Sequence, residues 1–132
     1  MAVIETRDWT RVIRNTTVAT CAPGKAYGLI PRGVVALDSV VDPTGAPAPH
    51  LLQLAYLNAA FETGIENPLD AAIVAAGKAA GLAVDGHVKI DEFPYDFFRR
   101  RLSIVVAGQS GPQSHLLITK GALSHVLAVC TR

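Results

Sequence analysis

The spacing of hydrophobic and polar positions predicts two consecutive helices in the middle of the chain. Apolar residues recur at helical spacing over residues 49–64, and Gly64 ends the run. Asn67 and Pro68 then supply an N-cap and a first-turn proline for a second, alanine-rich helix, which Gly81 stops. The short connection between the two segments predicts a helical hairpin.

Strand patterns lie on both sides of this hairpin. Apolar and β-branched runs bounded by glycine, proline or aspartate predict strands over residues 33–41, 86–93, 101–107 and 115–120. A run rich in threonine and valine over residues 12–19 also fits a strand, whereas turn residues fill residues 21–28, 42–45 and 108–112. Residues 121–130 predict a last amphipathic helix. This order predicts an α+β fold, with an antiparallel β-sheet flanked by helices.

Length and charge narrow the classes of function. The chain has 132 residues, half of them hydrophobic, which suffices for one ordinary domain with a substantial core. Its 12 basic and 11 acidic side chains leave a formal charge of +1, so we expect no nucleic-acid partner and no attraction to a membrane surface. No apolar stretch approaches the ~20 residues of a membrane span, so we expect no direct membrane insertion.

The spacing of cysteines and histidines predicts no metal site. Cys21 and Cys130 lie far apart and lack the spacing of zinc ligands, and the four histidines are scattered over separate predicted elements. We interpret the two cysteines as reduced thiols and therefore expect a cytoplasmic location.

Residues 91–106 are the segment richest in candidate chemistry. Phe97 and Phe98 are followed directly by three arginines, and this charged cluster leads into an apolar strand. Lys120 and Gly121 follow one strand later, where a cation sits beside a backbone that a ligand can approach closely. Aromatic faces and cations together predict a pocket for a flat anionic ligand such as a nucleotide.

Three blocks of sequence carry a resemblance to a known family. They are residues 54–73 (LAYLNAAFETGIENPLDAAI), residues 89–106 (KIDEFPYDFFRRRLSIVV) and residues 120–127 (KGALSHVL). In this order and at these separations they resemble the nucleotide-binding domain, or N-domain, of magnesium-translocating P-type ATPases. The resemblance implies an N-domain-like fold over residues 33–132 and leaves residues 1–32 as a divergent segment, for which we predict at most a strand and a loop.

The resemblance implies an adenine site on the strand at residues 89–106. In the family, adenine stacks on an aromatic residue seven positions before the apolar residue of the arginine-rich strand, and counting back from Leu102 gives Tyr95. The family's phosphate-side cation corresponds to Arg100, with Arg99 and Arg101 pointing elsewhere because alternate strand residues face opposite sides. The alternative is that Tyr95 is an ordinary aromatic residue on the face of the sheet.

The resemblance adds three further residues to the site. Lys120 and Gly121 match the family's Lys-Gly-Ala motif at the floor of the adenosine pocket, although a turn that simply needs glycine also explains them. Asp70 matches an acidic position that reaches the exocyclic amine of adenine or a neighbouring pocket residue. A capping role is equally compatible, because Asn67 and Asp70 have the spacing of a capping box.

The resemblance also limits the expected activity. Upstream of this domain, family members carry an aspartate that accepts the phosphoryl group, and the comparable residues 21–30 contain no aspartate. We therefore expect an ATP- or ADP-binding domain of, or derived from, a magnesium-transporting P-type ATPase, which holds adenine and phosphates without hydrolysing ATP alone. Mg²⁺ is expected only as the counter-ion of the nucleotide.

The expected partners follow from the same resemblance. They are the nucleotide and the phosphorylation domain of a P-type ATPase or another protein. The expected location becomes the cytoplasm or the cytoplasmic portion of a membrane transporter. The alternative function is a free-standing relative of the N-domain that acts as a regulatory or protein-interaction module, with weak or no nucleotide binding.

Overall fold

The fold is an antiparallel sheet with helices packed against it, as the sequence predicts. The computed structural model describes residues 2–6, 16–23, 35–42, 44–64, 67–107 and 114–130. The helices are α1 (His50–Phe61), α2 (Pro68–Ala79) and α3 (Leu123–Leu127). The strands are β1 (Ala2–Thr6), β2 (Thr16–Pro23), β3 (Val35–Val41), β4 (Val88–Asp96), β5 (Arg101–Ala107) and β6 (His115–Gly121).

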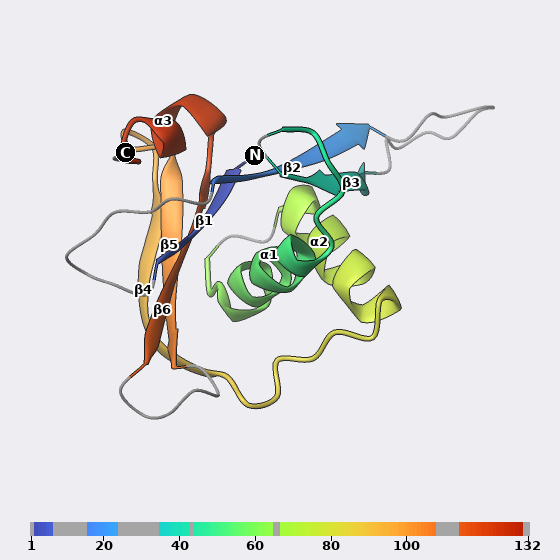
Figure 1. The fold of residues 1–132 in the computed structure, drawn as a ribbon. Coiled ribbons are helices and arrows are strands. Elements are labelled where there is room, and N and C mark those ends of the chain that lie inside the picture. Colours follow the sequence, from blue (N-terminus) through green and yellow to red (C-terminus); the bar gives the residue numbers. More distant parts are fainter. Residues whose placement is uncertain are drawn as a thin grey trace.

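The six strands form one sheet in the order β3-β2-β1-β6-β5-β4, and every neighbouring pair is antiparallel. Figure 1 shows α1 and α2 together on one side of this sheet, while α3 lies at one end of β5 and β6. The predicted α+β class is therefore confirmed. The separation of residues 1–32 from residues 33–132 stays a prediction.

Two strand predictions need correction. Residues 21–23 belong to β2 and pair with β3, although turn chemistry is predicted there. β4 continues past Phe93 to Asp96, and the pairing with β5 is irregular between these two residues, where Pro94 lies. Proline is tolerated at this point because β4 is an edge strand, and its missing N–H removes no hydrogen bond from a further neighbour. The predicted turns at residues 24–28 and 108–112 lie outside the described residues.

The last helix is shorter than predicted. Gly121 belongs to β6, where it pairs with Arg101 on one side and with Ala2 on the other. Ala122 has an extended backbone, with φ −64° and ψ 133°, and helix α3 therefore starts at Leu123 instead of residue 121. Sheet pairing on both sides of Gly121 outweighs the helical pattern of the residues that follow. β1, which the sequence does not predict, supplies one of these pairings.

The ends of the helical hairpin form as their sequence predicts. The Oδ1 atom of Asn67 accepts hydrogen bonds from the backbone N–H groups of Leu69 and Asp70, at 2.8 and 3.0 Å, and Pro68 occupies the first helical position. Gly81 follows the second helix with φ +72°, a conformation that favours glycine. This N-cap places Asp70 in the first turn of α2, which faces the sheet.

The core lies between α1 and the sheet face that it covers. Alternate residues of β5 point to this face, because successive side chains of a strand project to opposite sides. The buried residues of this cluster are Ala48, Leu51, Leu54, Ala55, Leu57, Ile73, Leu102, Ile104, Val106 and Ile118. The core therefore fixes which face of β5 and β6 lies under the helices.

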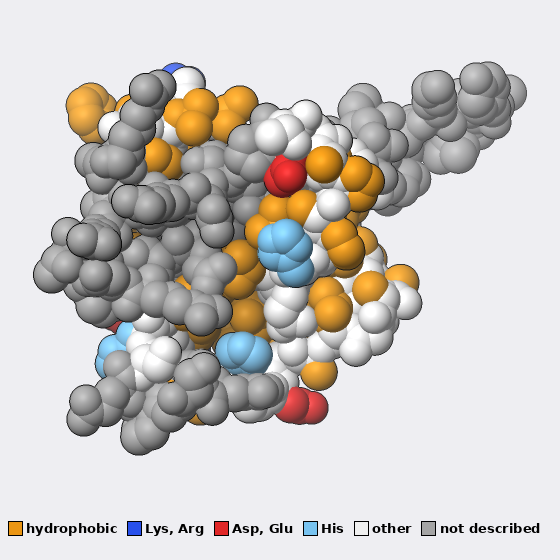
Figure 2. Space-filling view, viewed as in Figure 1, with side chains coloured by type: hydrophobic (Ala, Val, Ile, Leu, Met, Phe, Trp, Pro, Cys, Tyr) orange, Lys and Arg blue, Asp and Glu red, His pale blue; other side chains and the backbone are white. Residues whose placement is uncertain are grey.

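The face that carries the helical hairpin is shown in Figure 2. Hydrophobic side chains lie there among backbone and side chains of other types, with a few histidine and acidic side chains, and described lysine and arginine side chains are sparse on this side. None of the helices in the described ranges is both long and apolar enough to cross a membrane.

Candidate functional site

A cavity of about 290 Å³ lies at one end of the sheet, under the first turn of α2. Its walls come from β4, β5, the end of β6 and α2. The lining residues are Leu69, Asp70, Tyr95, Leu102, Lys120, Gly121 and Ala122. Four of the five site residues predicted from the sequence line this one cavity, and Arg100 is not among its lining residues.

Alternation along β6 brings Lys120 to the helix-covered face. Ile118 lies in the core, so Lys120, two residues later, projects to the same side. Lys120 pairs with Leu102 of β5, and both side chains line the cavity. Lys120 is only 5% exposed, which is rare for a lysine unless its charge is paired.

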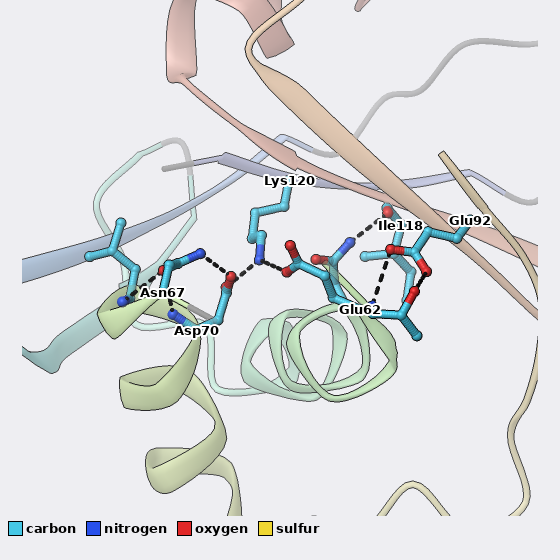
Figure 3. Close-up of polar contacts among 9 residues, drawn as sticks. Glu62, Asn67, Asp70, Glu92, Ile118 and Lys120 are labelled. Carbon is cyan, nitrogen blue, oxygen red and sulfur yellow. Dashed lines mark hydrogen bonds and ion pairs between the residues drawn. The ribbon is translucent and has the colours of Figure 1, made fainter. Parts of the chain in front are cut away.

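Contacts between α1 and β6 bring a glutamate to this lysine. The Nδ2 atom of buried Asn58 donates to the carbonyl oxygen of Ile118 at 2.8 Å. Glu62 lies one helical turn after Asn58, and its Oε2 atom is 2.9 Å from the Nζ atom of Lys120. The hydrogen bond and the ion pair are thus successive contacts along the same helix and strand (Figure 3).

Asp70 is the second carboxylate that contacts Lys120. Its Oδ1 atom accepts a hydrogen bond from the Lys120 ammonium, and its Oδ2 atom accepts one from the Nδ2 atom of Asn67. Figure 3 shows the ammonium between the carboxylates of Asp70 and Glu62. The Asn67 side chain therefore caps α2 and also orients Asp70, so a capping arrangement and a position on the cavity wall occur together.

The cluster of Glu62, Asp70 and Lys120 contains more negative than positive groups. One ammonium and two carboxylates sum to a charge of −1 when all three are ionised. Burial raises the pKa of Glu62, the hydrogen bond from Lys120 opposes this rise, and the nearby Asp70 carboxylate adds to it. The positive charge of Lys120 is thus fully compensated at the floor of the cavity.

Tyr95 forms an aromatic wall at the mouth of the cavity. It is 46% exposed, although it lines the cavity together with Leu102. Phe97 packs edge-to-face against it, with ring centroids 5.3 Å apart and an interplanar angle of 86°. Tyr95 thus combines a fixed position on β4 with a surface that a ligand can reach.

The turn between β4 and β5 is organised by Asp96. Its Oδ1 atom accepts hydrogen bonds from the backbone N–H groups of Phe98 and Arg99, at 2.7 and 2.9 Å. These bonds lower the pKa of Asp96, and an ion pair of its Oδ2 atom with the Nε atom of Arg99, at 2.8 Å, lowers it further. Hydrogen bonds and an ion pair between near neighbours in sequence therefore hold this turn.

The three consecutive arginines have different surroundings. Arg99 pairs with Asp96, and the Nη1 atom of Arg101 donates to the carbonyl oxygen of His125 at 3.4 Å. The Arg100 side chain is exposed and makes no hydrogen bond or ion pair with the described part of the chain. Its backbone has φ +50°, an uncommon value for a residue other than glycine. Arg100 is thus the arginine of this turn whose charge stays available to a ligand.

Gly121 is required by the neighbouring strand. A Cβ atom at this position would lie 2.5 Å from the carbonyl oxygen of Arg100 and 2.7 Å from the Cβ atom of Arg101. That carbonyl also accepts a hydrogen bond from the N–H group of Ala122 at 3.1 Å. Close packing therefore explains this glycine without a ligand, and its contact with a ligand stays a prediction.

Comparison with known proteins connects this fold to a family. Magnesium-transporting ATPase, P-type 1, of Salmonella typhimurium (strain LT2) is 40% identical to the chain over 107 residues, which is 80% of the chain. A second protein of that name from the same strain is 34% identical over 107 residues, and the Escherichia coli (strain K12) protein is 36% identical over the same length. The chain is homologous to one segment of the magnesium-transporting P-type ATPases.

The homologous segment is a small part of these ATPases. The chain spans 12% of the length of these relatives. No family model matches the chain. The resemblance predicted from the three sequence blocks is nevertheless confirmed by these identities, which extend over most of the chain and well beyond the blocks.

Glu62 is the residue of this site that the sequence analysis missed. It follows the core-facing positions Leu54 and Asn58 at spacings of eight and four residues, which places it on the buried side of α1. A carboxylate on that side needs a buried cation, and this spacing was the available signal. Among the described residues, no group of three or more histidine, cysteine, aspartate or glutamate side chains is placed to hold a metal ion.

Proposed function

We propose that the chain binds adenine nucleotides, ATP or ADP, in the cavity beside Tyr95. The observation that carries the proposal is the convergence of Tyr95, Asp70, Lys120 and Gly121 on one cavity, from three separate elements of a fold homologous to part of a P-type ATPase. The volume of about 290 Å³ lies just below the range of small-molecule sites, which span roughly 300–1,000 Å³. It suits a base better than a whole nucleotide.

The charges around the cavity favour one orientation of the ligand. The floor holds an ammonium between two carboxylates, which disfavours a triphosphate there. The apolar wall of Leu69, Leu102 and Ala122 and the ring of Tyr95 suit an uncharged base, and Asp70 offers a hydrogen-bond acceptor to its amine. Phosphates would then extend outward, where exposed Arg100 is the available cation.

We propose binding without hydrolysis by this segment alone. The residues that line the cavity would hold and orient a nucleotide. Mg²⁺ would accompany the phosphates as a counter-ion and would not join the base to the protein. In a transport ATPase the natural partner would be the phosphorylation domain, on the cytoplasmic side of the membrane. Transport of magnesium would belong to that larger assembly.

A pair of aromatic variants on β4 tests the proposal. Stacking of a base on an aromatic ring contributes about 1–3 kcal/mol, so Tyr95→Ala should weaken ATP binding about fivefold to 150-fold in calorimetric titrations. Phe93→Ala is the matched control, since Phe93 is similarly exposed on the same strand but does not line the cavity. Equal affinities of Tyr95→Ala and the unchanged protein would contradict the proposed site.

A protein-interaction module is the second candidate, because Phe97 and Phe98 are 82% and 92% exposed. Adjacent phenylalanines this exposed at a turn resemble the anchors of an interface. This candidate replaces the first if the unchanged protein binds neither ATP nor adenosine, while Phe98→Ser abolishes binding to an isolated phosphorylation domain of a magnesium-transporting ATPase. Unaltered binding by Phe98→Ser would eliminate it.

A further inference from the structure

Glu62 stands out because it touches the site without lining the cavity. It caps the C-terminus of α1, and its carboxylate reaches Lys120 from the side opposite Asp70 (Figure 3). Its side chain is only 10% exposed, compared with 12% for Asp70 and 6% for Lys120. The three charges are thus largely shielded from water, where each affects the others more strongly than at the surface.

One carboxylate would suffice to neutralise Lys120, and Asp70 already provides it. Asp70 is also held by the Nδ2 atom of Asn67, a contact that does not involve Glu62. Glu62 therefore adds a negative charge that the pairing of the lysine does not require. The added charge acts against any anionic group that approaches the floor of the cavity.

We propose that Glu62 sets the preference of the cavity between ligands with and without phosphates, because its carboxylate places a second negative charge beside the Lys120 ammonium. The inference rests on the proposed nucleotide site and adds a residue that controls its selectivity. With Glu62 charged, the floor repels phosphates and the base alone is favoured there. With Glu62 neutral, the Lys120 ammonium is balanced by Asp70 alone, and a phosphate-bearing ligand is tolerated better.

Uptake of a proton by Glu62 when ATP binds is an expected consequence of this arrangement. Within the described part of the chain, the charged groups that face Glu62 are Asp70 from α2 and Lys120 from β6, and Thr63 beside it contacts Glu92 of the Lys89–Glu92 pair on β4. The phosphates of a bound nucleotide, although they extend outward, add negative potential at this set, and protonation of Glu62, whose pKa burial already raises, relieves it. Binding of ATP should therefore take up a fraction of a proton, and binding of adenosine should take up none at this residue.

The test compares Glu62→Gln with Glu92→Gln. Glu92 is a matched control, because its carboxylate, like that of Glu62, forms an ion pair with a lysine, Lys89. Glu92 also accepts hydrogen bonds from Thr63 and has no contact with Lys120. Affinities for ATP and for adenosine are measured by calorimetry in two buffers of different ionisation enthalpy. The titration of the phosphates of ATP itself is the same for every variant, so differences between variants report on the protein.

Glu62→Gln should improve ATP affinity about threefold to tenfold relative to adenosine affinity and should abolish the protein's share of proton uptake. Glu92→Gln should change neither quantity. An equal effect of Glu62→Gln on both ligands, or unchanged proton uptake, would overturn the inference while leaving the nucleotide site intact. Failure of the unchanged protein to bind adenosine and ATP would overturn the proposed function and this inference with it.

Discussion

Two cations predicted to serve the same ligand have opposite surroundings. Lys120, at the floor of the cavity, is buried between Glu62 and Asp70, whereas Arg100, on the β4–β5 turn, is exposed and has no partner among the described residues. Their charges look equivalent in the sequence, but only the one at the turn is available to an anion. The fold thus separates an electrostatically closed floor, suited to a base, from an open rim, suited to phosphates.

The largest expected difference between floor and rim is in stability. Lys120→Met leaves two buried carboxylates without their cation, and the free energy of unfolding should fall by about 3–5 kcal/mol. Arg100→Met removes an exposed charge and should change it by less than about 0.5 kcal/mol. Urea unfolding followed by circular dichroism measures both. Similar losses for the two variants would contradict the contrast.

Glu62, at the floor, and Glu92, outside it, should change the pH dependence of stability in opposite directions. The pKa of Glu62 is raised above its ordinary value of 4.5, so the native state keeps a proton that the unfolded state releases, and stability falls as pH rises above about 4.5. Burial alone would also raise the pKa of Glu92, but hydrogen bonds from Lys89 and Thr63 outweigh it and lower this pKa. The stability that Glu92 contributes is therefore present above pH 4.5 and is lost as pH falls below it.

Glu62→Gln and Glu92→Gln should reveal these opposite signs in unfolding experiments from pH 3 to pH 8. Relative to the unchanged protein, Glu62→Gln should gain stability as pH rises through the window above 4.5. Glu92→Gln should be less stable at neutral pH, with a difference that shrinks below pH 4.5. If the free energies of unfolding of the two variants change with pH in parallel, the pKa values of Glu62 and Glu92 are not shifted in opposite directions.

The smallest expected effect concerns the rim. Exposed charge pairs contribute about 0.2–1 kcal/mol, so Arg100→Gln should weaken ATP binding by at most about fivefold and leave adenosine binding unchanged. Arg99→Gln is the matched control, because the Arg99 guanidinium is already paired with Asp96. A larger loss of ATP affinity in Arg99→Gln than in Arg100→Gln would assign the phosphates to the other arginine.

Much of the fold was predictable because its signals are local. The cap formed by Asn67 and Pro68, the apolar run of β5 and the turn at Asp42 each depend on residues a few positions apart. The sequence patterns predict no β1 and start the last helix two residues too early, at residue 121, for one shared reason. Gly121 pairs with Ala2, more than a hundred positions away in the sequence, and no local pattern reports such a pairing.

Several residues around the cavity were predictable, but the balance of their charges was not. The resemblance names Tyr95 and Lys120, and the structure brings both to one cavity. Lys120 is neutralised by Asp70, 50 positions away, and Glu62, 58 positions away, adds a second negative charge to the buried pair. The pairing of Arg99 is different, since Asp96 lies three positions before it and the bond forms within the turn. Long-range packing therefore decided which predicted cation stays available.

Chemical-shift mapping would locate a bound nucleotide on the protein. ¹⁵N-labelled protein is titrated with ATP up to millimolar concentration, and the amide resonances around Leu69, Asp70, Tyr95 and Lys120 to Ala122 are followed. We expect saturable shifts concentrated at these residues, which line one cavity although they are distant in the sequence. Saturable shifts confined to other parts of the protein, or no shifts at all, would contradict it.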